Sequence, residues 1–160
     1  MLELIPGRKG RLAAAISATI GLSGLICSPA TAALGGDVAS IESDRQALGG
    51  SHVVTRMQHY DRHEIATASG LRVHEFADTT GRVFALSWDG QAQPDLQTLL
   101  GNHYSEYSSA AKVRRVANHH VFSAQSGGLV IQIIRRPRGL TGMASVPALM
   151  PAGIDAQELR

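Results

Sequence analysis

Apolar and polar residues alternate along most of the chain after residue 50, which is the pattern of β-strands. Segment 82–88 is apolar on both faces, so we expect it to lie in the middle of a sheet, whereas 141–146 is expected at an edge. Asp78-Thr79-Thr80-Gly81 has the composition of a hairpin turn, with glycine where φ must be positive. The predicted strands are 53–60, 64–69, 72–77, 82–88, 119–125, 129–134 and 141–146.

One stretch between these strands repeats apolar residues at spacings of three and four, the period of an amphipathic helix. Pro94 suits its first turn, and Asp95 suits the positive end of the helix dipole. A shorter helix is expected at 37–48, ended by Gly49-Gly50. The apolar stripe of the longer helix consists of Leu96, Leu99, Leu100, Tyr104, Tyr107 and Ala111.

The order of strands, one long helix and more strands, joined by short connections, predicts an α+β fold. We expect an antiparallel sheet of about five to six strands packed against one main amphipathic helix. Residues 33–160 would form this single domain.

Residues 1–32 have the three features of a secretory signal peptide. Arg8, Lys9 and Arg11 form a positive stretch, and an uncharged apolar run of 15 residues follows. Ala30-Thr31-Ala32 supplies the small residues of a cleavage site, so the mature chain would begin at Ala33. We therefore expect a periplasmic or secreted protein.

Two other interpretations of residues 1–32 have less support than a cleaved signal peptide. An uncleaved membrane anchor needs roughly 20 apolar residues, more than this run offers. A lipid anchor would use Cys27, but the bulky residues Leu25 and Ile26 precede it. We therefore expect no stable membrane span once the signal has been removed.

Removing the signal changes the charge and the cysteine content. Residues 1–32 contain three of the 15 basic and one of the 13 acidic side chains, which leaves 12 of each. A neutral chain gives no support for nucleic-acid binding, which needs a basic surface. Cys27 is the only cysteine, so the mature protein has no disulfide and no thiol chemistry.

Several short motifs form a recognisable set: the segment 81–90, Pro94-Asp95-Leu96 with Leu99-Leu100-Gly101, Ser126-Gly127-Gly128, and the late Gly142-x-Ala144-x-x-Pro147 and Pro151-x-Gly153. Together they resemble the family called domain of unknown function 2844. The resemblance implies a small exported bacterial protein of one domain and implies no known activity. The loop around Arg135 to Arg138 is more basic than that family leads us to expect.

His59, Asp61 and His63 are the candidate metal ligands. On a strand the three alternate and would share one face, and two imidazoles with a carboxylate suit zinc or another divalent metal. His119 or His120 would supply a fourth ligand, although not both, because adjacent strand residues face opposite ways. A polar hairpin tip in solvent is the competing interpretation, and we favour it. No cofactor is predicted beyond this metal.

Other patterns point less clearly to chemistry. His74-Glu75 has the residue types of an acid–base pair, but its members should face opposite ways on a solvated sheet face. Trp88, Phe84, Tyr104 and Tyr107 would line a pocket or, as we favour, the core. The sequence contains no G-x-S-x-G, Walker or G-x-G-x-x-G motif.

Arg135, Arg136 and Arg138 would form an exposed loop that either meets an anionic partner or blocks association at a sheet edge. Together these patterns favour a non-catalytic binding module whose partner is an unidentified protein or ligand of the cell envelope. The alternatives are a metal-dependent enzyme using His59, Asp61 and His63, and a structural accessory of a surface assembly.

Overall fold

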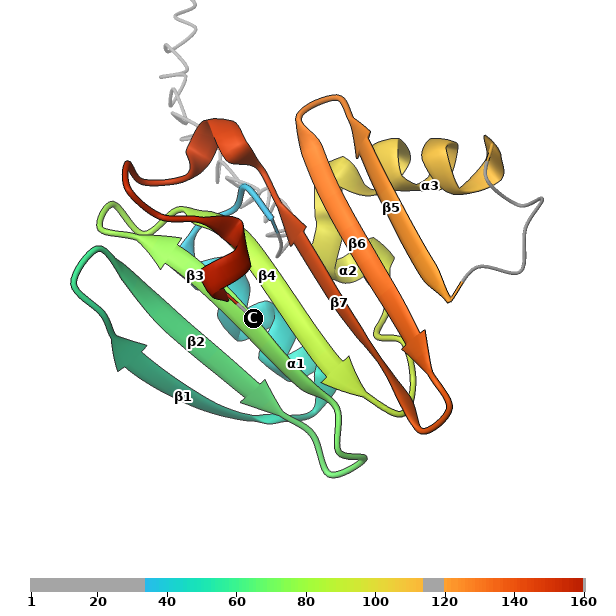
Figure 1. The fold of residues 1–160 in the computed structure, drawn as a ribbon. Helices are drawn as coiled ribbons and strands as arrows, with labels where there is room; N and C mark the ends of the chain where they lie inside the picture. The colour runs from blue at the N-terminus through green and yellow to red at the C-terminus, as the bar shows by residue number, and fades with distance from the viewer. Residues whose placement is uncertain (1–33, 114–119, 160) are drawn as a thin grey trace, which may run out of the picture.

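The computed structural model describes residues 34–113 and 120–159, and its centre is one antiparallel sheet of seven strands (Figure 1). The strand order is β1-β2-β3-β4-β7-β6-β5, so both halves of the chain contribute to one continuous sheet. The strands are β1 (Ser51–Arg56), β2 (Tyr60–Ala66), β3 (Arg72–Asp78), β4 (Val83–Gly90), β5 (Val121–Ser126), β6 (Leu129–Arg136) and β7 (Gly139–Ser145).

The two faces of the sheet are covered unequally. The helices lie behind it in Figure 1, and we call the face that they cover the inner face. The C-terminal segment crosses the outer face over β3, β4 and β7 and leaves the rest of that face uncovered (Figure 1). The inner elements are α1 (Val38–Leu48), α2 (Leu96–Leu100), η1 (Gly101–His103) and α3 (Tyr104–Val113); the outer ones are η2 (Pro147–Leu149) and η3 (Ala156–Leu159).

The predicted α+β class and antiparallel sheet are confirmed, but the count of five to six strands is too low. The expected edge position of 141–146 is also wrong, because β7 pairs with β4 on one side and β6 on the other. The true edges are β1 and β5. Gly142 in the central strand β7 has no side chain because the Trp88 ring lies against it.

Both predicted helices are present. Asp37 caps α1 by accepting a hydrogen bond at Oδ1 from the Ser40 amide, at 3.1 Å, and Gly49 ends the helix in the left-handed region with φ of 65°. The longer helix is interrupted at Gly101, where φ is 48° and ψ is −119°. Its stripe still faces the core on both sides of that break.

The main core fills the space between the inner face and the helices. Most of its large side chains come from alternate positions of the strands or from the apolar stripes of the helices, and Leu34, Leu71 and Val146 come from connecting segments. Its large buried side chains include those of Ile41, Ile65, Val73, Leu86, Trp88, Leu99, Leu100, Leu129 and Ile131. A smaller cluster lies on the outer face beneath the C-terminal segment and consists of Phe76, Phe84, Ala85, Met143 and Leu159.

Trp88 and Gly142 show how closely the central strands are packed. They are register partners on β4 and β7, and the indole ring lies over the glycine. A Cβ atom at Gly142 would overlap the ring atoms Cζ2 and Cε2 of Trp88. The glycine is therefore required by this contact, because any side chain would displace the ring from the core.

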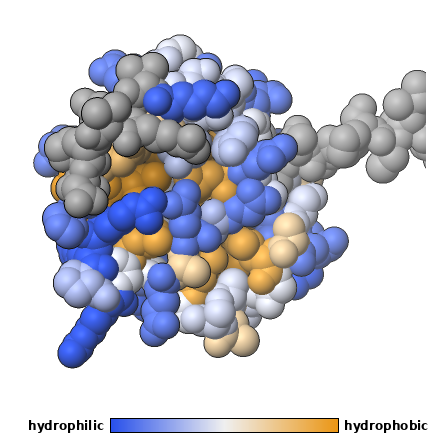
Figure 2. Space-filling view, turned by 90° about the vertical axis from the view of Figure 1, so that its right-hand side faces the viewer, coloured by the Kyte–Doolittle hydropathy of each residue, from blue (hydrophilic) through white to orange (hydrophobic). Residues whose placement is uncertain are grey.

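The edge strands leave apolar residues on the surface. Val53 of β1 is 59% exposed, and Val121 of β5 is 46% exposed. Figure 2, which views the side where β5 lies, shows hydrophobic surface between hydrophilic residues. In the described part of the chain neither edge strand has a second neighbour in the sheet.

Candidate functional site

A hollow of about 210 Å³ lies on the uncovered part of the outer face. It crosses β3, β4, β7 and β6, and most of its lining side chains point away from the helices; the inner-face residues Trp88 and Gly142 also border it. Ile134 and Met143 give it an apolar floor, and polar groups surround them. The polar lining side chains are those of His74, Ser87, Asp89, Gln132, Arg136 and Thr141.

Two acidic groups near this hollow are already paired with basic ones. Glu64 and His74 approach to 3.3 Å between Oε2 and Nε2, and Arg72 reaches Asp89 Oδ2 at 3.2 Å through Nη2. These contacts hold His74 and Asp89 in place beside the hollow. Among the described residues around the hollow, the charges left without an ionic partner are therefore cationic.

The hairpin between β6 and β7 carries those cations, and we call Arg135, Arg136, Pro137 and Arg138 the arginine hairpin. The structure corrects its expected extent, because β6 continues through Arg136 and β7 begins at Gly139, which leaves a two-residue turn. All three arginines are exposed. Arg135 donates to Gln93 Oε1 at 3.4 Å, whereas Arg136 and Arg138 form no ion pair with any described residue.

Arg136 connects the arginine hairpin to the face of the sheet. It lines the outer-face hollow and also two adjoining surface hollows beside the turn. One of these is bordered by Arg135 and Arg138, and the other by Arg138 and Asp89. The arrangement is suited to an anion held by guanidinium groups at the end of a partly apolar surface.

A second polar cluster is buried on the inner face. Asp44 of α1 and Glu75 of β3 are both completely inaccessible to solvent, and we call them the carboxyl pair. Burial raises the pKa of Asp44 to about 7. Burial, together with the neighbouring Asp44 carboxylate, raises the pKa of Glu75 to about 9. At least one of the two carboxyls is thus protonated at neutral pH.

Two histidines lie beside this cluster. His63 is buried on β2 opposite Glu75 in the register of the two strands, and its Nδ1 is 3.0 Å from His52 Nε2 on β1. The rings stack with 5.2 Å between their centroids. Burial, followed by the nearby His52, lowers the pKa of His63, so this imidazole is held in its neutral form.

The structure separates the predicted metal ligands. His59 is exposed in the turn before β2, Asp61 is half-buried, and His63 is buried and occupied with His52. Of the fourth-ligand candidates, His120 is exposed and His119 falls outside the described residues. Among residues 34–113 and 120–159, no group of three or more metal-ligating side chains comes together.

His74 and Glu75 do face opposite ways, as the alternation predicts, but the expected solvation of Glu75 is wrong. Its neighbours Val73 and Ala77 occupy the same face and are buried, so the position belongs to the core in spite of its charge. Asp44 was not predicted to belong to any site. The signal was available, because Ile41, Asp44 and Leu48 lie at helical spacing on one face of α1.

Of the aromatic residues, Trp88 and Phe84 are buried in the core, as favoured. Tyr104 and Tyr107 are half-buried against it. The predicted cleavage site, Ala30 and Ala32 followed by Ala33, lies outside the described residues. Within the part of the chain that is described, no helix has both the length and the apolar character needed to cross a bilayer.

These features define an α+β protein built on one antiparallel sheet, with one face closed by helices and the other partly open. A family model described as "Protein of unknown function (DUF2844)" matches residues 30–159. The chain belongs to that family, which confirms the resemblance found in its motifs. No curated protein and no solved structure gives a significant match.

Proposed function

We propose that this protein is an exported, non-catalytic binding module of the cell envelope, and that the arginine hairpin with the outer-face hollow binds anionic phospholipid headgroups. The observation that carries the proposal is the position of Arg136, between two further exposed arginines and a partly apolar hollow. Guanidinium groups bind phosphate oxygens in a planar, bidentate manner.

Charge complementarity favours an anionic surface as the partner. Arg136 and Arg138 have no ionic partner among the described residues, so binding a phosphate replaces water and breaks no existing ion pair. Each arginine near an anionic membrane surface contributes about 1 kcal/mol of attraction. Ile134 and Met143 offer apolar contact to the part of a lipid next to its headgroup.

Vesicle co-sedimentation tests this proposal. The mature protein, residues 33–160, is mixed with vesicles of phosphatidylglycerol or of phosphatidylcholine at low ionic strength. We expect binding to the anionic vesicles alone, and we expect the double variant Arg136→Gln/Arg138→Gln to bind about tenfold more weakly or worse. Equal binding to both lipids, or no binding to either, would contradict the proposal.

Arg56→Gln is the matched control, because Arg56 is an exposed arginine on β1, at the opposite edge of the sheet. It removes the same charge and should leave vesicle binding nearly unchanged. If both changes weakened binding equally, the attraction would depend on net charge alone and the hairpin would have no special role.

Export is tested separately by mass spectrometry of the native protein recovered from cell envelopes. We expect a mature N-terminus at Ala33, produced by cleavage after Ala32. A cytosolic protein that retains Met1 would contradict the assignment to the envelope.

A further inference from the structure

Helix α1 is attached to the sheet through one face that contains a buried carboxyl group. This helix has only 11 residues, and an isolated helix of that length is unstable in water. Its contact with the sheet depends on Ile41 and Leu48, which pack in the core, and on Asp44 between them. A carboxyl group therefore occupies the centre of the face that holds this helix in place.

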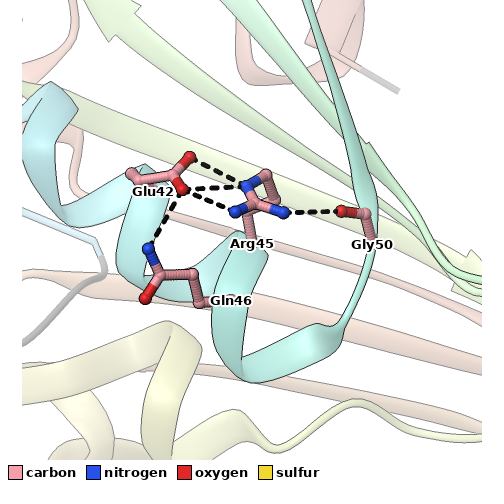
Figure 3. Close-up of polar contacts among 4 residues, drawn as sticks. All are labelled: Glu42, Arg45, Gln46 and Gly50. Carbon is pink, nitrogen blue, oxygen red and sulfur yellow. Dashed lines mark hydrogen bonds and ion pairs between the residues drawn. The ribbon is translucent and has the colours of Figure 1, made fainter.

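The opposite face of α1 is stabilised within the helix and its own C-terminal turn. Arg45 donates to Glu42 at 2.6 Å between Nη2 and Oε1, and Gln46 donates to the same oxygen at 3.1 Å (Figure 3). Arg45 also donates to the carbonyl of Gly50 at 3.2 Å (Figure 3). These contacts stabilise the helix and its end, but none of them involves Asp44.

The oxygens of the carboxyl pair lack ordinary donors. All four are buried, and no N–H or hydroxyl group of the described residues donates to them. Two ionised carboxylates cannot hydrogen-bond to each other, because both are acceptors only. A proton on either one supplies the missing donor, as in other sites where two carboxyls share one proton.

Among the described residues, no basic side chain is hydrogen-bonded to the pair to compensate for a second negative charge. From the adjoining strands, β2 presents the neutral His63 and, further along the same face, Asp61. β1 presents His52 and, at its far end opposite Asp61, the exposed Arg56. β4 presents the uncharged Leu86 and Trp88. On α1 itself the charged groups are Glu42 and Arg45, which are bonded to each other.

We propose that the carboxyl pair is a proton-dependent contact that keeps α1 on the sheet: the helix stays docked while the two carboxyls share a proton and is released when both ionise. Release would expose part of the inner face of β2 and β3, including Ile65 and Val73. The domain would thus have a pH-sensitive helix next to its N-terminal segment. This inference is independent of lipid binding.

The direction of the pH effect follows from proton counting. In the released state both carboxyls have ordinary pKa values near 4, so both lose their protons by about pH 6. In the docked state burial raises both pKa values, to about 7 and about 9. The docked state therefore binds more protons, and its stabilisation, complete below about pH 4, is lost as the pH rises through those two values.

Hydrogen–deuterium exchange tests the inference on the mature protein at pH 5 and pH 8, with rates corrected for intrinsic exchange. We expect the opening equilibrium of amides 38–48 to rise at least tenfold between the two values, because opening releases at least one proton. Amides of β6 should change much less. Equal protection of α1 at both values would overturn the proposal, and so would an equal loss in α1 and β6.

Two neutral variants of nearly the same shape, Asp44→Asn and Glu75→Gln, should each weaken this pH dependence, and the double variant should remove most of it, because burial raises the pKa of both carboxyls. Glu42→Gln is the matched control, since Glu42 lies two residues from Asp44 on the exposed face of α1, and it should keep the wild-type response. If neither neutral variant folds, ¹³C NMR of the wild-type protein can measure the ionisation state of the two carboxyls directly and so test the proposal. Two carboxylates fully ionised at pH 6 would overturn the proposal.

Discussion

Strands β2 and β3 place a histidine and a glutamate opposite each other twice, on adjacent rungs of the ladder and on opposite faces. His63 faces Glu75 on the inner face, and Glu64 faces His74 on the outer face. The outer two approach as an ion pair at 3.3 Å. The inner two instead use other partners, because His63 contacts His52 and Glu75 lies against Asp44.

Burial explains why the same residue types behave differently a few ångströms apart. On the outer face water remains near both groups, so each can carry charge at little cost. On the inner face a charge would lose its hydration, and the cheaper state is a neutral imidazole with a carboxyl pair that keeps a proton. The sheet thus separates a hydrated outer face, where side chains can be charged, from a buried inner cluster whose stability requires that the carboxyl pair keeps a proton.

The largest expected effect tests whether the two faces differ as much in packing as in charge. Ile133 and Ile134 are neighbours on β6, and Ile133 is 2% exposed on the inner face whereas Ile134 is half-buried in the outer-face hollow. We expect Ile133→Ala to lower the free energy of unfolding by about 3 kcal/mol. Ile134→Ala should cost about 1 kcal/mol or less, because water already reaches its site.

Urea unfolding of both variants measures this difference directly. Similar losses for the two isoleucines would mean that the outer face is covered in solution as completely as the inner one. The comparison between an open and a closed face would then be wrong, and with it the proposed lipid site.

A second, smaller effect probes how tightly the inner face is packed around Trp88. Gly142→Ala places a methyl group against the indole ring, and we expect a loss of about 2 kcal/mol with altered tryptophan fluorescence. Gly128→Ala is the control: it also carries a conformational cost, since φ is 94° there, but meets no atom within 4 Å. It should cost about 1 kcal/mol and leave the fluorescence unchanged.

Much of the fold could be predicted from the sequence because local patterns and tertiary packing agree. Alternation marked the strands, and Asp37 and Gly49 marked the ends of α1. The order of the strands could not be predicted in this way. β6 and β7 form a local hairpin, but the position of β7 beside β4 depends on pairing between residues 50 to 60 positions apart, and no local pattern records that.

The candidate sites were predicted less well, for a related reason. The arginine hairpin is a run of like charges and is visible in the sequence. The carboxyl pair joins Asp44 and Glu75, 31 positions apart. Acidic residues are seldom fully buried, so Glu75 was assigned to a solvated face and Asp44 was not considered. The spacing of His59, Asp61 and His63 suggested a metal site on the assumption that all three lie on one strand. His59 instead lies in the turn before β2, so its side chain is not on the face that His63 occupies.

The smallest expected effect concerns the ion pair on the outer face. Glu64→Gln removes the partner of His74, whose side chain is 21% exposed, while that of Glu64 is 35% exposed. Exposed pairs of this kind contribute from zero to about 1 kcal/mol, so we expect a loss of about 0.5 kcal/mol in low salt and less in high salt. A salt-independent loss of several kcal/mol would show that the outer pair is as desolvated as the inner one. The contrast between the two rungs would then have to come from hydrogen bonding, because burial would be the same on both faces.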